Sequence, residues 1–172
     1  ANPVTVTTGA TISKETATLE NTTFTEIDLQ HQNNNSFSDT IENAMKKLSS
    51  PSDITCIYAG NNSFKSLDGI SSFNNLQELY LNDNKLTDLS AVSDCNRLKT
   101  LVLSYNKIRD LSFLSSLTAL EYLDISSNKN IKDISVLYRL THLKTLNISN
   151  TNVSQKEYRQ LIKKLPACQI IY

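Results

Sequence analysis

Apolar side chains recur along the chain at a period of 22 residues, with Asn at the same place in most periods. One period carries Leu76, Leu79, Leu81, Asn84, Leu86 and Leu89, and the next carries Leu98, Leu101, Leu103, Asn106, Ile108 and Leu111. Within each period two apolar residues stand two apart, which predicts a short strand with one side in the core and the other in solvent. Such self-similarity predicts a repeat protein whose units stack on one another.

The same register covers five units, called here coils one to five, which begin at Ile54, Leu76, Leu98, Leu120 and Leu143. Positions are counted from that first residue, and coil four has one additional residue after Asn128. Weaker copies lie at both ends of the array, at Phe24, Ile27 and Leu29 and at Leu165, Cys168 and Ile170. A single coil buries too little apolar surface to offset its ordering entropy, so each coil needs neighbours or a cap.

The pattern L-x-x-L-x-L-x-x-N-x-(L/I)-x-x-L resembles that of the leucine-rich-repeat family over roughly residues 24–172. Among 22-residue repeats it resembles bacterial internalin-type domains and eukaryotic phosphatase-regulatory repeats. The segment from Leu111 to Leu120 is close to the internalin consensus, although the usual Pro after Ser112 is absent. The resemblance implies an α/β, right-handed solenoid with a parallel β-sheet on the concave face, short 3₁₀ or irregular convex turns and helical caps at both ends. A helical bundle is disfavoured because each period holds several turn-forming Asn and Ser residues.

Four segments are expected along the chain. They are a flexible or edge-strand N-terminal arm at 1–23, with a strand near Thr11 to Thr18, an N-terminal cap with a helix at 24–53, five coils at 54–153, and a C-terminal cap helix and strand at 154–172. The first helix would begin after Ser38 as N-cap and carry Ile41, Ala44 and Met45 at helical spacing. The second would begin after Ser154 and carry Tyr158, Leu161, Ile162 and Leu165, before Pro166 and a short strand at 168–171.

An asparagine ladder is expected at position nine, formed by Asn62, Asn84, Asn106 and Asn128. These side chains would turn inward and bond backbone groups of their own coil and of the next one, where the chain leaves each strand. We interpret these residues as structural.

Charge and hydropathy remove several classes of partner. Seventeen basic and seventeen acidic residues give zero net charge, so the field that draws in nucleic acid is missing. No apolar run is long enough to span a membrane and no uncleaved signal peptide is present. We therefore expect a monomer without a nucleic-acid partner and without membrane insertion. Because the chain starts at Ala1 rather than Met, we expect a processed or trimmed end.

No set of residues predicts catalysis, a metal or a cofactor. His31 and His142 lie about five coils apart, on the order of 20 Å or more at the strand spacing, which excludes a shared metal or a triad. The three Gly form no phosphate loop. The cysteines, Cys56, Cys95 and Cys168, lie too far apart to form disulfides, and Cys95 should be a small core residue. We expect no enzymatic activity, no metal site and no cofactor.

The outward positions three, five and eight predict a binding surface on the concave face. We assign this surface to Tyr58, Glu78, Tyr80, Asp83, Val102, Tyr105, Tyr122, Asp124 and Asn147, with Cys56, Thr100 and Thr145 also pointing outward. Tyrosine is enriched at binding hot spots. The alternative is that the tyrosines only stabilise the sheet as cross-strand pairs. The acidic residues favour a protein partner with a basic surface.

Three functions fit these observations. The first is a non-catalytic protein-binding module, exported or on the surface of a bacterial cell, as the resemblance to internalins and the Thr-rich start indicate. The second is a cytoplasmic scaffold or a phosphatase-regulator-like subunit. The third is an enzyme with an unrecognised site. The identity of the partner is not encoded in a recognisable motif.

Overall fold

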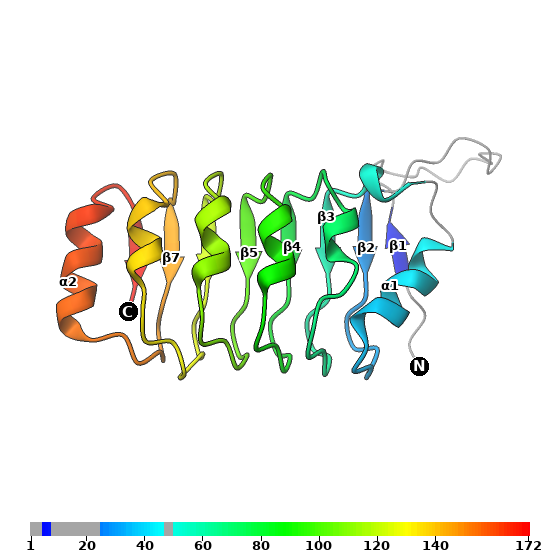
Figure 1. Cartoon of the computed structure of the whole chain (residues 1–172), viewed down its shortest axis with the longest axis horizontal. Coiled ribbons are helices and arrows are strands. Elements are labelled where there is room, and N and C mark those ends of the chain that lie inside the picture. Colours follow the sequence, from blue (N-terminus) through cyan, green and yellow to red (C-terminus); the bar gives the residue numbers. More distant parts are fainter. Residues whose placement is uncertain (1–4, 8–24, 47–49) are drawn as a thin grey trace.

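The fold is a single open sheet whose strands follow one another in chain order (Figure 1). The computed structural model describes the backbone of residues 5–7 and all atoms of residues 25–46 and 50–172. The strands are β1 (Thr5–Thr7), β2 (Glu26–Asp28), β3 (Cys56–Tyr58), β4 (Glu78–Tyr80), β5 (Thr100–Val102), β6 (Tyr122–Asp124), β7 (Thr145–Asn147) and β8 (Gln169–Ile171). The strands from β2 to β8 are parallel, and β1 pairs antiparallel with β2. The strand predicted near Thr11 to Thr18 lies outside the described residues.

Short 3₁₀ turns form the side of the solenoid opposite the sheet (Figure 1). They are η3 (Ile70–Ser72), η4 (Ser90–Asp94), η5 (Ser112–Ser116) and η6 (Ser135–Arg139), and a further turn, η2 (Pro51–Asp53), precedes β3. One helix covers each end of this layer, α1 (Phe37–Met45) and α2 (Gln155–Lys164). Each 3₁₀ turn takes few residues to return the chain to the sheet, which is why a period of 22 residues suffices.

The core confirms the predicted register. The apolar residues at positions one, four, six, eleven and fourteen of the coils are buried, and Leu79, Leu101, Leu123 and Leu146 have no exposed surface. These four leucines pair with one another across β4 to β7 at the middle of each strand. One apolar column therefore runs through the stack, and each coil buries the faces of its two neighbours.

The asparagine ladder is present, but its bonds run toward the preceding coil rather than the next one. Asn106 Nδ2 donates to Leu81 O at 2.8 Å and to Leu103 O in its own coil at 3.1 Å. Its Oδ1 accepts the backbone N–H of Leu86, again in the preceding coil, at 3.0 Å. Equivalent bonds are made by Asn84 and Asn128. The bonds run in this direction because the backbone carbonyls within reach of the inward-turned amide belong to its own coil and to the preceding one.

The first rung of the ladder differs from the others. Asn62 Nδ2 donates to Leu29 O at 2.8 Å, but its buried Oδ1 has no partner among the described residues. The helical insertion that carries α1 replaces the regular coil before Asn62, so no position-eleven N–H reaches this oxygen.

Position eight of every coil has a left-handed backbone. Its residues are Asn61, Asp83, Tyr105, Ser127 and Asn150, with φ between 54° and 57°. This conformation turns the chain out of the strand and aims the following Asn inward. Asn and Asp tolerate left-handed backbone better than Tyr, so Tyr105 holds the least favourable side chain of the series.

The two helical caps start at serines, one of them not the predicted one. Helix α1 has Ser36 as its N-cap, with Oγ accepting from Asp39 N at 3.2 Å, and not Ser38. The bond from Ser36 N to Asn34 Oδ1 fixes this start two residues earlier. Helix α2 begins after Ser154 as predicted, and Glu157 completes a capping box.

Candidate binding surface

The concave face consists of two rows of side chains, one at position three and one at position five of successive strands. The in-register pairing aligns Glu78 with Thr100 and Tyr122, and it aligns Tyr80 with Val102. The row at position three comprises Glu26, Cys56, Glu78, Thr100, Tyr122, Thr145 and Gln169, and the row at position five comprises Asp28, Tyr58, Tyr80, Val102, Asp124, Asn147 and Ile171. The structure thus places the predicted strand residues on one surface.

A stacked pair of tyrosines forms the first part of this surface. The rings of Tyr58 and Tyr80 lie 4.8 Å apart between centroids, with 15° between their planes. The Tyr80 hydroxyl donates to Glu78 Oε2 at 2.7 Å. Burial, followed by this hydrogen bond, raises the pKa of Tyr80, and a side-chain hydrogen bond with Cys56 raises the pKa of Tyr58. Both phenols therefore keep their protons at physiological pH.

Cys56 does not belong to the accessible surface, although its position points outward. Only 5% of its surface is exposed, and burial raises the pKa of its thiol to about 12. Tyr58, Glu78 and Glu26 are the groups that interact with it. The larger neighbouring side chains cover the small Cys56 side chain. The alternation of strand positions therefore predicts which way a side chain points, but it does not predict how much of that side chain is exposed.

Two further tyrosines stand apart from the stacked pair and are more exposed. Tyr122 on β6 is 36% exposed, and Tyr105, in the turn after β5, is 60% exposed. Burial, then the charge of Asp124, raises the pKa of Tyr122. These rings are among the exposed large apolar side chains of the described residues, and both lie in the middle of the array.

Asp124 and Asn147 have a structural role that the sequence analysis did not identify. Asp124 Oδ1 accepts from Ser126 N at 2.9 Å, and Asn147 Oδ1 accepts from Ser149 N at 3.1 Å. Each side chain thus closes a turn at the end of its own strand. Asn147 Nδ2 also donates to Asp124 Oδ2 at 3.3 Å. Only part of their polar surface is left to a partner.

The acidic surface extends one strand further than predicted. Glu26 and Asp28 on β2 align with Cys56 and Tyr58, so their carboxylates border the tyrosine pair. Asp28 Oδ1 accepts from Gln30 N at 2.9 Å. The weak copy containing Ile27 carried this information, because Glu26 and Asp28 flank it at positions three and five. Asp83, at position eight, accepts from Asn82 Nδ2 at 3.0 Å.

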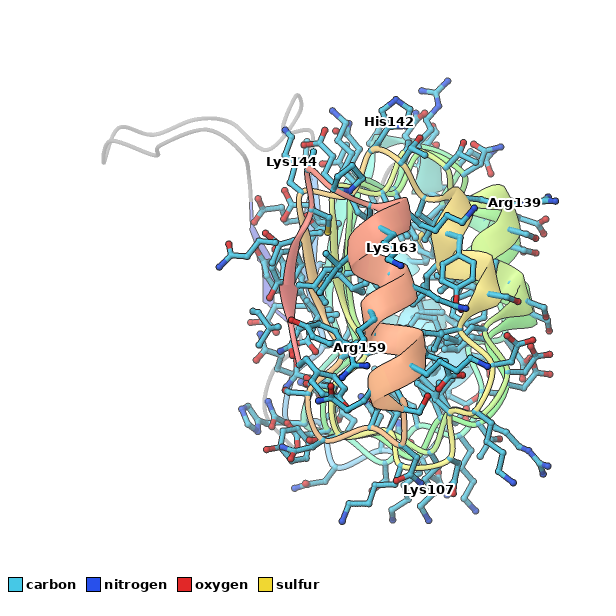
Figure 2. All side chains as sticks on the ribbon, turned by 90° about the vertical axis from the view of Figure 1, so that its left-hand side faces the viewer. Lys107, Arg139, His142, Lys144, Arg159 and Lys163 are labelled. Carbon is cyan, nitrogen blue, oxygen red and sulfur yellow. The ribbon has the colours of Figure 1, made fainter. Side chains whose placement is uncertain are left out.

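Basic residues limit the acidic character at one margin of the face. A shallow depression there is lined by Gln77, Glu78, Lys99, Thr100, Glu121, Tyr122, Lys144 and Thr145. Lys144 pairs with Glu121 at 2.5 Å, and this ion pair lowers the pKa of Glu121. Lys144 lies at the upper edge of the sheet in the end-on view of Figure 2. The acidic part of the face therefore centres on β2 to β4.

No metal-binding arrangement is found among the described residues. They contain no group of three or more His, Cys, Asp or Glu side chains that could hold a metal ion. Cys56, Cys95 and Cys168 are free, and Cys95 is buried with 1% exposure. In the described part of the chain, none of the helices has the length and apolar character needed to cross a membrane.

The fold and the ladder define a leucine-rich-repeat solenoid with an exposed parallel sheet. The chain belongs to the leucine-rich-repeat family, because the family model described as leucine rich repeats, two copies, matches residues 53–94 and 96–139, together half of the chain. No curated protein sequence matches it significantly.

Three solved structures have a similar fold. An internalin, InlF, from Listeria monocytogenes superposes with a TM-score of 0.74 at 24% identity, over 86% of this chain and 40% of that one. A leucine-rich-repeat protein from Leptospira interrogans gives 0.63 at 27% identity, over 70% and 32%. Internalin C2 from Listeria monocytogenes gives 0.52 at 21% identity, over 69% and 61%. The chain spans less than two thirds of the length of each of these proteins.

Proposed function

We propose that the chain is a non-catalytic module that binds a protein through its concave face. The observation that carries this proposal is the combination of a rigid parallel sheet with exposed tyrosines bordered by carboxylates. Tyr122 and Tyr105 offer large contact areas with polar tips, and tyrosine is enriched at binding hot spots. Their backbones are fixed by the coil stack, so little conformational entropy is lost on binding.

The partner we propose is a protein with a basic surface patch. Glu26, Asp28 and Glu78 concentrate negative charge beside the Tyr58 and Tyr80 rings, and Asp83 adds an exposed carboxylate in the turn after β4. An Arg or Lys side chain placed there gains attraction from both the carboxylates and the faces of the rings. Asp124 contributes less, because it already holds the Ser126 amide.

We further propose an exported or surface-exposed bacterial protein that acts as a monomer. The similarity to the Leptospira protein and to the two internalins supports this proposal through the fold. A cytoplasmic scaffold or phosphatase-regulator-like subunit is the second candidate, because the same repeat geometry serves both. Fractionation of the source cells, with antibody detection of the chain, separates the two.

The binding proposal is tested by removing rings from each side of the solenoid. Once affinity capture has provided a partner, calorimetry compares wild type with Tyr80→Ala and Tyr122→Ala. Each is expected to weaken binding by about 1–3 kcal/mol. The controls are Tyr138→Ala and Ser112→Ala, on the 3₁₀ turns of the opposite side, with folding checked by circular dichroism. Full affinity in both concave variants, with loss in a control, refutes the proposal.

A further inference from the structure

A row of cations follows one edge of the solenoid, where the chain leaves the sheet. Its members come from positions ten and twelve of coils one to four, and all are exposed: Lys65, Lys85, Lys107, Arg109, Lys129 and Lys132. We call this set the cation edge. Figure 2 shows Lys107 at the lower edge of the end-on view, pointing away from the ribbon and opposite His142. The cation edge thus lies beyond the strand rows at positions three and five, and it begins two residues after Asp83 and Tyr105.

Backbone hydrogen bonds hold the cation edge in a regular arrangement. The N–H of Lys85 donates to Phe64 O at 2.9 Å, and the N–H of Lys107 donates to Leu86 O at 2.9 Å. Successive coils are thus stacked directly at position ten, and neighbouring strands lie about 4.8 Å apart. Position ten carries a Lys in each of coils two to four, and position twelve carries a cation in coils one, three and four, whereas coil one has Ser63 at position ten and coil two has Thr87 at position twelve.

A shallow groove crosses the cation edge between coils two and four. It is lined by Thr87, Lys107, Arg109, Asp110, Asn130 and Lys132. The additional residue of coil four, which precedes Ile131, places Asn130 in this lining. Three cations thus line one depression, which is suited to bind an anionic group between their side chains.

The charges of the cation edge are not neutralised by ion pairs within the described part of the chain. The ion pair found among the described residues joins Lys144 to Glu121, and it lies at the opposite edge of the sheet. Asp88, Asp110 and Asp133 each stand two residues before a 3₁₀ turn begins, and they accept from the backbone amides of Ser90, Ser112 and Ser135, each at 2.8 Å. These three carboxylates are thus engaged by their own turns.

From this arrangement we propose that the cation edge binds a linear sulfated polysaccharide. A line of single charges at a fixed repeat matches a chain that carries permanent anionic groups along its length. Five of the six cations are Lys, which acts as a point charge and pairs with an anionic group without a fixed two-pronged geometry. No aromatic side chain occupies positions ten or twelve, so stacking of nucleic-acid bases is not provided. No exposed apolar side chain at these positions is available for insertion into a membrane.

The test uses heparin as the probe and the whole chain as the protein. Binding is measured by calorimetry across a range of salt concentrations. In the triple variant Lys85→Gln, Lys107→Gln and Lys129→Gln, affinity is expected to fall at least tenfold. The slope of log affinity against log salt is expected to decrease by about two to three, because fewer counterions are released.

The matched control is the triple variant Arg159→Gln, Lys163→Gln and Lys164→Gln, which removes the same charge from the exposed face of α2 (Figure 2). It is expected to lose less than threefold. Equal losses of affinity in the two variants would show that heparin does not bind at the cation edge. Absence of heparin binding by the wild type at low salt overturns the proposal. Tighter binding of oligo-dT or of phosphatidylserine vesicles than of heparin overturns the assignment to a polysaccharide. The tyrosine variants should bind heparin normally, so this test and that of the proposed function fail independently.

Discussion

Tyr58 and Tyr80 stack across neighbouring strands, with their ring centroids 4.8 Å apart and their planes 15° apart. The two residues occupy the same position in consecutive coils, and the parallel register sets their Cα atoms opposite each other. A repeat protein thus brings two identical side chains together without any further constraint. The pair can stabilise the sheet and can also present a flat apolar surface.

The stabilising part of this pair is measurable in a double-mutant cycle. Tyr58→Ala, Tyr80→Ala and the double variant are expected to give a coupling free energy of about 0.5–1.5 kcal/mol in urea unfolding. The same cycle for Tyr80 and Tyr122, which lie two strands apart, should give coupling within error. Coupling of equal size in both cycles would show that the ring contact is not its source.

The asparagine ladder gives a second prediction, about stability. Asn106→Ala leaves the buried Leu86 N–H without a partner and leaves the Leu81 carbonyl only its longer bond from Asn84 Nδ2 at 3.2 Å, which should cost about 1–3 kcal/mol of unfolding free energy. Asn62→Ala should cost less, since the Asn62 Oδ1 has no partner to lose. Chemical denaturation of both variants measures the difference, and a larger cost at Asn62 would contradict the role assigned to the oxygen.

The core and strand positions could be predicted from the sequence because burial repeats with the coil. Leu101 and Leu123 occupy the same position in successive coils, so once the 22-residue period is recognised, the burial of both can be predicted. The cap at Ser154 was also predictable, since Glu157 three residues later completes a local pattern. Features that depend on one residue and its immediate neighbours, or on an unbroken repeat, are thus visible in the sequence.

Features that depend on contacts between different side chains were not predictable in this way. Cys56 points outward but is covered, because its exposure is decided by the size of neighbours from other strands. The ladder direction depends on which carbonyls the preceding coil leaves free. Ser36 and Ser38 are equivalent as N-caps by residue type, and two bonds distinguish them, from Ser36 N to Asn34 Oδ1 and from Asp39 N to Ser36 Oγ. The site residues themselves remain a prediction until a partner is available.

The backbone at Tyr105 gives a third prediction. Its φ of 55° is unfavourable for a large side chain, and coils one and five have Asn at this position. Tyr105→Asn or Tyr105→Gly should therefore raise the unfolding free energy by up to about 1 kcal/mol. Tyr105→Ala is the control, because it removes the ring without relieving the backbone to the same extent. Thermal and urea unfolding measure the series, and equal stability of all three variants would locate the effect in the ring.

The buried thiols predict how stability depends on pH. Burial raises the pKa of Cys56 to about 12 and that of Cys95 to about 11, from about 9. The folded state therefore holds these protons more tightly than the unfolded state, so this stability is fully present below about pH 9 and is lost as pH rises toward 11 to 12. Cys56→Ala should flatten part of that decline in urea unfolding between pH 8 and 11. An unchanged slope in this variant would contradict the assignment.

The same thiols should differ in reactivity. Cys168 is partly exposed, whereas Cys56 and Cys95 are buried. Native protein treated with iodoacetamide near pH 8 should be modified first at Cys168, because its thiol is the most accessible of the three. Mass spectrometry of peptides gives the order, and denatured, unreduced protein should show all three thiols. Faster modification of Cys56 than of Cys168 would mean that the cover over Cys56 opens readily.

The C-terminal cap stabilises the last coil through one side of its helix. Within α2, Leu161 has no exposed surface, whereas Ile162, next to it in the sequence, is 45% exposed. Leu161→Ala should lower the unfolding free energy by about 2–5 kcal/mol, because it leaves a cavity in the hydrophobic core to which Leu161 belongs. Ile162→Ala removes a side chain of the same size from the solvent side and should change stability by less than about 1 kcal/mol. Urea unfolding followed by circular dichroism compares the two. If the solenoid unfolds as one unit, the loss in Leu161→Ala appears as a shift of the whole transition, whereas a separate early step would show that the cap unfolds by itself and that coils one to four are stable without it.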